Sequence, residues 1–276
     1  GNDFEQCGIW GGLPKFGRNL RSVAFTNELS DEQGRLVAQH CTNLTYVHFH
    51  SQYGSSAMRS ILEANIYIED LHLHFDLRNT MIPAGADVLS LSLGGMSLPN
   101  LSALAMIGDA FRHEHILDAL TMSNKIVRLD LYTPKISQST ILQISSQCPH
   151  LKALGLVYAP LNDDILAHLT KSCSQIVHLD ILNVSGWEGN VGITDTGILA
   201  IVQNLPGLQS LNIKNNHNLT DASLVHIYTH CANTLHTLYL SCGVKNGVGQ
   251  LYGPEAVRDL LERCTNIRTL SFGFFS

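Results

Sequence analysis

One six-residue pattern, L-x-x-L-x-L with Ile, Val or Phe also allowed at its fixed positions, recurs along the whole chain. It begins at residues 20, 44, 68, 88, 126, 151, 176, 208, 235 and 267, so neighbouring copies start 20 to 38 residues apart. A short alternating apolar run is typical of a β-strand with one buried side. Recurrence at this interval indicates stacked units, none of which can bury its apolar side alone.

A second recurring piece lies between these strands. In "LNDDILAHLTKSC" and "LTDASLVHIYTHC" the apolar residues are three and four positions apart, as on one face of a helix. A Ser, Thr or Asn before an acidic residue suits a helix start, and Ser30 with Gln33 fits a capping box. The sequence therefore predicts an α/β solenoid of about ten repeats, shaped as a horseshoe. Its parallel β-sheet should line the concave face, with helices on the convex face.

Four intervals depart from this plan. Between the patterns at 68 and 88 we expect a loop around "IPAG" in place of a helix, and after 88 we expect a lengthened helix or two helices over 101–124. Glycine-rich insertions follow the strands at 176 and 235, and they should place loops along one rim of the solenoid.

Composition excludes several classes of protein. Hydrophobic residues make up 45% of the chain, which argues against disorder. The net charge is −6 without a basic run, so we expect no nucleic-acid partner. No apolar run approaches the roughly 18 residues needed to cross a bilayer, and the start shows no signal-peptide pattern, so we expect no membrane partner. Because the chain begins at Gly1, we expect a piece of a longer protein.

The cysteines indicate the compartment. Five of the seven stand three or four residues before an apolar pattern, one per repeat, which suits buried thiols and not a disulfide framework. That arrangement favours a reducing compartment, either cytoplasmic or nuclear. Four Asn-x-Ser/Thr sequons, at Asn43, Asn100, Asn183 and Asn218, point weakly the other way.

The units resemble cysteine-containing leucine-rich repeats, with the close matches "CPHLKALGL", "CSQIVHLDI" and "GITDTGILAIV". Such repeats are typical of F-box/leucine-rich-repeat proteins and of the related antagonist of the mitotic exit network. The resemblance covers about residues 20–272. It implies a domain that holds a protein substrate, while an upstream F-box binds Skp1 of a cullin–RING ubiquitin ligase. Residues 1–19 are too few for an F-box.

Two segments follow from this comparison. Residues 20–276 should form the leucine-rich-repeat domain. Residues 1–19 should form an N-terminal cap or linker, in which Trp10 and Phe16 cover the end of the solenoid.

Two His-x-His pairs follow the repeat. Strand side chains alternate, so residues between the apolar positions should face outward. His48 and His50 lie on one strand, and His72 and His74 follow 24 residues later, which is one repeat. The pairs should therefore lie side by side, about 4.8 Å apart. We expect a polar partner-binding surface here and no metal site, although zinc held by the histidines with Asp70 stays an alternative.

The same alternation gives the other candidate contacts for a partner. Tyr and Arg among them are the residue types that anchor protein interfaces. Around Gly155 and Val157 the face should be small and apolar, with room for a side chain of the partner. The candidate residues are Tyr46, His48, His50, Asp70, His72, His74, Arg128, Asp130, Tyr132, Val157, His178, Asp180, Asn212 and Tyr239.

The motifs of catalysis are missing from the sequence. No Gly-x-Ser-x-Gly elbow or phosphate-binding loop occurs, and His113 and His115 are two residues apart, so they would point to different sides of a helix. We therefore expect a protein-interaction scaffold that is not an enzyme and carries no cofactor, and the resemblance favours the substrate-recognition part of an F-box-type ligase receptor. A free-standing adaptor or effector, and a small-molecule or metal sensor, stay open as alternatives.

Overall fold

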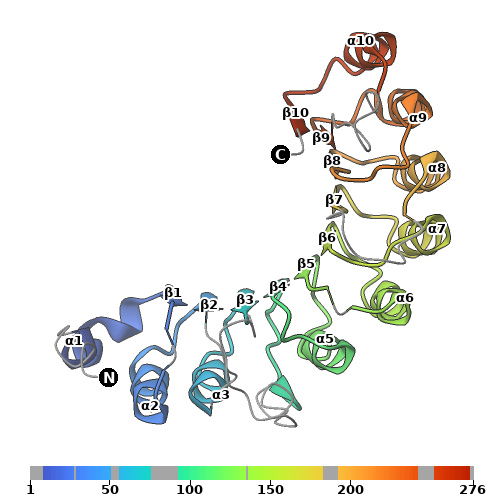
Figure 1. The fold of residues 1–276 in the computed structure, drawn as a ribbon. Coiled ribbons are helices and arrows are strands. Elements are labelled where there is room, and N and C mark those ends of the chain that lie inside the picture. Colours follow the sequence, from blue (N-terminus) through green and yellow to red (C-terminus); the bar gives the residue numbers. More distant parts are fainter. Residues whose placement is uncertain are drawn as a thin grey trace. The chain divides into compact units, whose positions relative to one another are not determined.

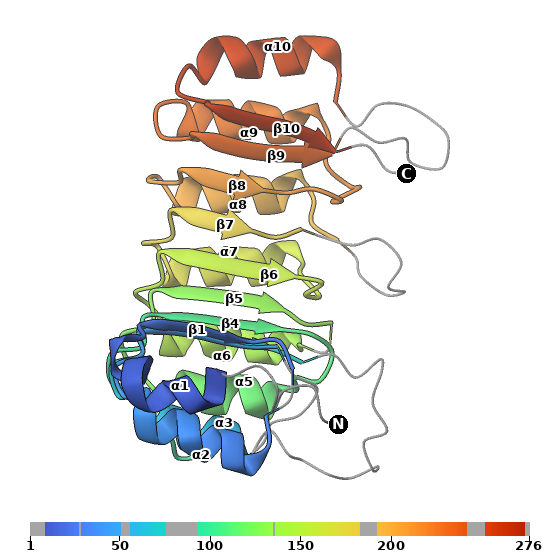
Figure 2. The same cartoon turned by 90° about the vertical axis from the view of Figure 1, so that its left-hand side faces the viewer.

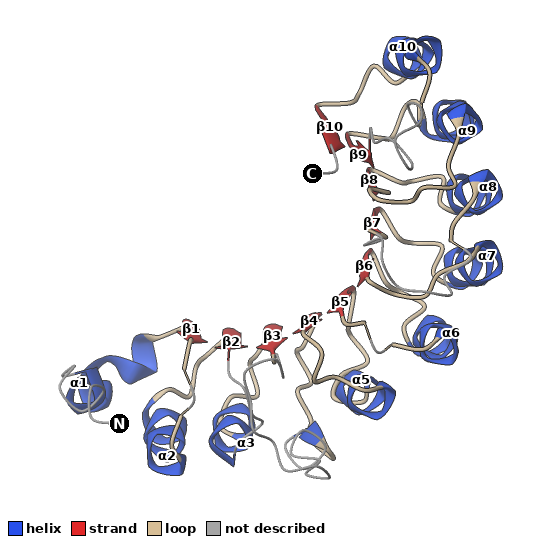
Figure 3. Ribbon diagram, viewed as in Figure 1, coloured by secondary structure: helices blue, strands red, loops and turns tan. Residues whose placement is uncertain are grey.

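The computed structural model describes residues 9–27, 29–50, 56–75, 93–134, 136–182, 192–241 and 252–273. The chain divides into two compact units, Gly1–Ile126 and Val127–Ser276, and each is described by itself. In both units the parallel strands lie on one side and the helices on the other (Figures 1 and 3).

Unit 1 begins with helix α1 and a 3-10 turn, followed by four parallel strands in the order β1-β2-β3-β4. The helices that connect or follow them pack behind the sheet (Figure 1). The bounds are α1 Ile9–Phe16, η2 Gly17–Asn19, β1 Ser22–Phe25, α2 Asp31–His40, β2 Tyr46–His50, α3 Ser56–Glu63, β3 Asp70–His74, β4 Ala103–Ile107 and α5 His113–Leu120.

Unit 2 repeats a strand and a helix with little variation. Six parallel strands pair in chain order, and Figure 2 looks onto them with their helices behind. The bounds are β5 Arg128–Tyr132, α6 Gln138–Gln147, β6 Ala153–Val157, α7 Asp163–Ser172, β7 His178–Asp180, α8 Asp195–Asn204, β8 Ser210–Asn212, α9 Asp221–Cys231, β9 Thr237–Ser241, α10 Pro254–Arg263 and β10 Thr269–Gly273.

The core of each unit lies between its sheet and its helices. The pattern leucines that we expected to be buried are buried, with Leu154, Leu156 and Leu179 no more than 2% exposed. Register explains the arrangement, since Leu154 is paired with Leu129 on one side and Leu179 on the other. Each strand therefore adds one rung to a continuous aliphatic stack.

One strand was predicted in the wrong place. The neighbour of β3 in the sheet is β4 (Ala103–Ile107), with Asp70 opposite Ala103, so the lengthened helix expected over 101–124 is wrong. The segment "LSALAM" also fits L-x-x-L-x-L, and Leu104 and Met106 are buried. Apolar Ala105 stands at the outward position between them, which weakens the alternation that marks a strand. Residues 76–92, with the loop around "IPAG" and nearly all of the pattern at 88, lie outside the described residues.

The described cysteines are free, buried thiols, as expected. Four of them cap the C-terminal ends of helices: Cys41 of α2, Cys148 of α6, Cys173 of α7 and Cys264 of α10. Burial raises the pKa of Cys148 and Cys173 to about 11, so both remain protonated at neutral pH. The Cys173 Sγ lies 3.4 Å from the carbonyl oxygen of Cys148 and so links successive repeats.

The helix starts also follow the sequence. Ser30 and Gln33 form the predicted capping box at α2, and Ser137 and Asn162 cap α6 and α7 with their side chains. At the N-terminal end of unit 1, α1 lies beside α2 with Leu13 buried, and Phe16 is 39% exposed. In the described part of the chain, none of the helices combines the length and the apolar character that spanning a membrane requires.

A ladder of carboxylates joins the helix starts of unit 2. Asp163 at the start of α7 accepts hydrogen bonds from the Thr194 N–H (2.9 Å) and hydroxyl (2.6 Å) in the next repeat. Asp195 accepts the same two bonds from Thr220, at 2.9 and 2.6 Å, and a third from the Ser223 hydroxyl. Each carboxylate thus fixes the residue that caps the following helix.

We predict that Asp195→Ala lowers the free energy of unfolding by about 1–3 kcal/mol, because it removes charge-assisted bonds to the next repeat. Burial opposes ionisation of Asp195, but the bonds from Ser223 and Thr220 outweigh it and hold its pKa below the usual value. The stabilisation is therefore complete above the unfolded pKa of about 3.9 and is lost as pH falls through the lower folded pKa. Urea unfolding at pH 7 and at pH 3 measures both effects.

The matched control is Asp164→Ala, which removes an exposed carboxylate from the first turn of α7. Its effect should stay within a few tenths of a kcal/mol, as for other exposed first-turn acids. Equal losses in the two variants would contradict a ladder between repeats.

Candidate partner-binding face

The strand face is defined here as the solvent side of the parallel strands in each unit. It is built by alternation, because every second residue of a strand points away from the helices. In unit 2 the register sets these outward residues in rows across the strands, with Asp180 between Gly155 and Asn212 in one row. Of the fourteen candidate residues, all except Val157 are at least partly exposed.

In unit 1 the two histidine pairs lie side by side, as predicted. His48 is opposite His72 and His50 is opposite His74 in the register of β2 and β3. The ring centroids are 5.6 Å apart in the first pair and 4.3 Å in the second, with the rings edge to face. Tyr46 continues the cluster, with its ring 5.2 Å from that of His72. We call His48, His50, His72 and His74 the histidine cluster.

The charges around the histidine cluster are few. Asp70 Oδ1 lies 3.0 Å from His72 Nε2. His48 Nε2 is buried and has no hydrogen-bond partner among the described residues. Burial lowers the pKa of His48, and the charges of His72, His50 and His74 lower it further. Within the described ranges, no three His, Cys, Asp or Glu side chains are placed to hold a metal ion.

In unit 2 the strand face carries a hollow of about 280 Å³, with its lining drawn from β5 to β9. At one wall, Arg128 Nε donates to Asp130 Oδ2 at 2.7 Å, and the Asp130 side chain is only 15% exposed. The small residue Ala153 of β6 also lines the hollow. The lining residues are Arg128, Asp130, Tyr132, Ala153, Leu154, His178, Leu179, Asp180, Ser210, Asn212 and Tyr239.

Asp180 is the second carboxylate of the hollow. Burial raises its pKa, and the negative charge of Asp130 acts in the same direction. The Leu182 N–H, which donates at 3.1 Å, and the Asn212 side chain favour the ionised form, as does the more distant charge of Lys214, but together they do not cancel the shift. Burial and the same two carboxylates also raise the pKa of Tyr132.

Lys214 is a second cation close to the row of Asp180 and Asn212, and it has contacts of its own. Lys214 Nζ donates to Ser271 Oγ at 3.0 Å and lies 5.0 Å from the centre of the Tyr239 ring. That position gives it a hydroxyl partner and a cation–π contact toward β10. Lys214 lies two residues after Asn212, so the outward alternation predicts it at an exposed position, and it is partly exposed.

Two expectations about the middle of unit 2 are corrected. Val157 is only 2% exposed, so it cannot be the surface contact that the alternation predicts. It is a short side chain set beside the larger Tyr132 of β5, and it lies below the surface. Gly155 is not an apolar opening either, because the Asp130 carboxylate leans over it. A Cβ at Gly155 would lie 2.7 Å from Asp130 Oδ1.

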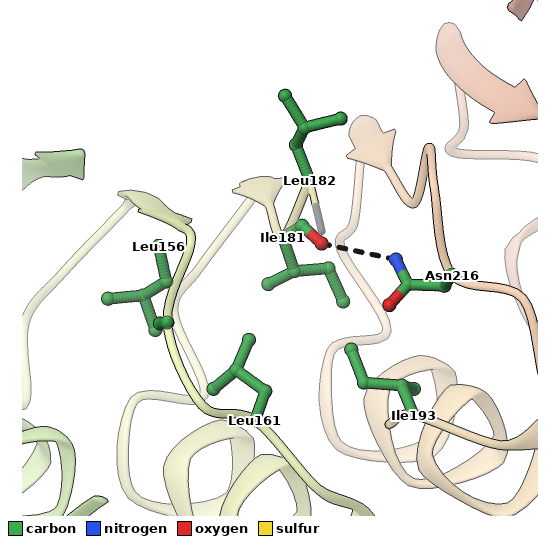
Figure 4. Close-up of a pocket in the computed structure, with 7 residues that line it drawn as sticks. Leu156, Leu161, Ile181, Leu182, Ile193 and Asn216 are labelled. Atoms are coloured by element: carbon green, nitrogen blue, oxygen red, sulfur yellow. Dashed lines mark hydrogen bonds between the residues drawn. The ribbon is translucent and has the colours of Figure 1, made fainter. Parts of the chain in front are cut away.

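A second pocket in unit 2 belongs to the core. Figure 4 shows aliphatic side chains around the Asn216 amide, including those of Leu156, Ile181 and Ile193. Asn216 Nδ2 donates to the carbonyl oxygens of Ile181 (3.1 Å) and Ile213 (3.0 Å), which joins the ends of two repeats. The space does not admit a water molecule, so its role is structural. Sequence reasoning missed Asn216, although it follows the third apolar position of its pattern by three residues.

Comparisons with known proteins bear on the fold. A scan against protein-family models finds no match for the sequence. A solved structure of the yeast Rad7 and Elc1 complex is similar, with a TM-score of 0.51 and 15% identity over 96% of this chain and 79% of that chain. So is the TLR13–ssRNA13 complex, with a TM-score of 0.53 and 14% identity over 95% of this chain and 34% of that chain. The fold is a leucine-rich-repeat solenoid of about ten repeats.

We predict that His48 titrates below the usual histidine pKa of about 6.5. Replacing His72 with Gln should raise the pKa of His48, because one neighbouring positive charge is removed. Since folding lowers this pKa, unit 1 should lose stability as pH falls through 6.5, when the unfolded chain takes up a proton first. NMR titration of the histidine ring carbons reads each site separately.

The matched control is His150→Gln, an exposed histidine of unit 2. It should leave the titration of His48 unchanged. An unaltered His48 curve in the His72→Gln protein would show that the rings of the histidine cluster do not interact electrostatically.

Proposed function

We propose that this chain is a non-enzymatic protein-interaction scaffold that binds a protein partner on its strand face. The observation that carries the proposal is that the inward and outward residues of each strand have different roles. Inward residues such as Leu154 and Leu179 complete the core, while the outward rows hold tyrosines, an arginine and carboxylates that the core does not need. Tyr and Arg are enriched at the energetic centres of protein interfaces.

A finer proposal places the scaffold in a ubiquitin ligase receptor of the F-box type, as the part that recognises the substrate. Its support is the cysteine-containing repeat, in which Cys148 and Cys173 close their helices at matched positions. A similar fold occurs in a structure of two associated proteins, Rad7 and Elc1. Skp1 and a cullin would then be held by a segment outside the repeats. Since fold alone does not determine function, this step rests on analogy.

Free thiols also support a location. The described cysteines are reduced and buried, which suits the reducing cytoplasm or nucleus. The competing proposal is a free-standing adaptor or effector with the same strand face and without Skp1. A metal sensor would draw its support from the histidine cluster, and calorimetric titration with zinc at pH 7.5 tests that reading directly.

We predict that Arg128→Ala with Tyr239→Ala abolishes capture of the protein partner by the tagged full-length protein from an extract of its own cells. Both residues stand at outward positions of their strands, on the side away from the helices, so the fold should persist. Quantitative mass spectrometry of the captured proteins, with immunoblots for Skp1 and cullin, supplies the measurement.

The matched control removes the same two residue types from the helix side. Tyr228 and Arg263 lie in cation–π contact there, 4.8 Å from ring centroid to guanidinium, and Tyr228→Ala with Arg263→Ala should keep the partner. Retention of the partner by both double variants would refute the strand face as the binding surface. Capture without Skp1 or cullin would favour the adaptor over the ligase receptor.

A further inference from the structure

The small residue Ala153 of β6 lines the hollow of unit 2. β6 contributes Ala153 and Gly155 to the outward rows, between the larger residues of β5 and β7. Asp130 stands on one side of Gly155 and Asp180 on the other, each one strand away. The backbones of the two acidic residues are therefore about two strand spacings, or roughly 9.6 Å, apart. Asp130 and Asp180 both line the hollow of about 280 Å³, which has room for more than one water molecule.

The positive charges near the hollow do not neutralise both Asp130 and Asp180. Arg128 is paired with Asp130 at 2.7 Å, and its own side chain is 58% exposed at the rim. Lys214 is turned toward Ser271 and the Tyr239 ring. His178 is exposed on the neighbouring row. Among the described residues, Asp180 has hydrogen bonds from Leu182 and Asn212 but no ion-pair partner.

A partly buried carboxylate without a cation is unfavourable in a folded protein. The raised pKa of Asp180 agrees with its position in the lining of the hollow, where it is partly shielded from water. A cation that entered the hollow beside Asp180 would supply the missing positive charge. It would also be met by the Asn212 side-chain oxygen and by two aromatic rings, those of Tyr132 and Tyr239, which line the same hollow.

We propose that this hollow binds an arginine side chain of the protein partner, with Asp180 as the principal acceptor. This inference rests on the proposed function, and it adds the chemistry by which the partner is recognised. A guanidinium is planar and carries five donors, so it can bond Asp180 and Asn212 while its face lies against a tyrosine. A lysine ammonium is a compact charge with all its donors on one nitrogen, so it lacks the planar array of donors that a guanidinium presents to two acceptors. Acidic side chains would be repelled by the carboxylates, and an apolar side chain would leave Asp180 without a partner.

The probe is the peptide acetyl-Gly-Arg-Gly-amide, titrated into the ¹⁵N-glycine-labelled protein. The amide signal of Gly155 should shift and saturate, because Gly155 is paired with Asp180 in the register and follows Leu154, which lines the hollow. The citrulline peptide has the same shape without the charge, and it should bind at least tenfold more weakly. The lysine peptide should fall between the two.

Asp180→Asn tests the acceptor. Asparagine keeps an oxygen for the Leu182 N–H but loses the charge, so the arginine peptide should bind about tenfold more weakly. The variant should be folded and at least as stable at neutral pH, because a costly charge has been removed, and its melting temperature checks this. The matched control is Asp164→Asn, the same change at an exposed position of α7, which should leave peptide binding unchanged.

Gly155→Ala provides a second variant. Its new methyl group would lie 2.7 Å from Asp130 Oδ1 and would displace this carboxylate, which lines the hollow, so binding of the arginine peptide should fall while that of the citrulline peptide stays weak. Equal shifts with the arginine and citrulline peptides, or unchanged binding in Asp180→Asn, would overturn the proposal. The same holds if the arginine peptide causes no saturable shift.

These outcomes separate the two proposals. If the partner is lost from the Arg128/Tyr239 double variant but binds Asp180→Asn as well as it binds wild type, the strand face is the interface and the arginine hollow is wrong. If the peptide binds as described but the double variant keeps its partner, the hollow exists and the partner binds elsewhere, which contradicts both the proposed function and its extension.

Discussion

The structure depends on the fact that no single repeat can bury its own apolar side. A strand and its helix make a two-layered unit whose open sides are closed only by the units before and after it. This requirement sets the register, since Leu154 must meet Leu129 and Leu179 for the stack to be continuous. The outward residues inherit the same register without being selected for packing. Packing of the core therefore aligns outward rows such as Asp130, Gly155 and Asp180. The surface of the strand face consists of these outward residues, which take no part in the core.

The helices are tied along the solenoid at both ends by polar groups. At their starts, Asp163 and Asp195 each hold the threonine that caps the next helix. At their ends, the thiol of Cys173 reaches back to the Cys148 carbonyl of the preceding repeat. Neither bond is needed to form an isolated helix, because each acts between repeats. Together they keep successive helices in step with the strands, so a one-residue slip in the sheet would break bonds on the helix side as well.

The sequence was sufficient for the repeat, the histidine register and the capping box, because each depends on spacing alone. It failed where spacing was ambiguous or where size decided the result. At Ala105 an apolar outward residue hid a strand within a run that reads as helix. At Val157 the alternation was right about direction but wrong about exposure, since larger neighbours surround a short side chain. The hollow could not be predicted, because its shape depends on the rotamers of side chains from five strands, such as that of Asp130, whose carboxylate lies over Gly155.

The strand face of each unit carries an ionisable residue whose charged form lowers the stability of the folded protein. His48 is partly buried among three other imidazoles, and Asp180 is partly buried beside a second carboxylate. In each case folding disfavours the charged form, so the group opposes folding in the pH range where it is ionised in the unfolded chain. Packing of the core does not explain these two residues, because the buried leucines of the same strands pack without them. The proposed binding surface would account for them, because a ligand of complementary charge would recover in the complex the free energy that the unbound face lacks.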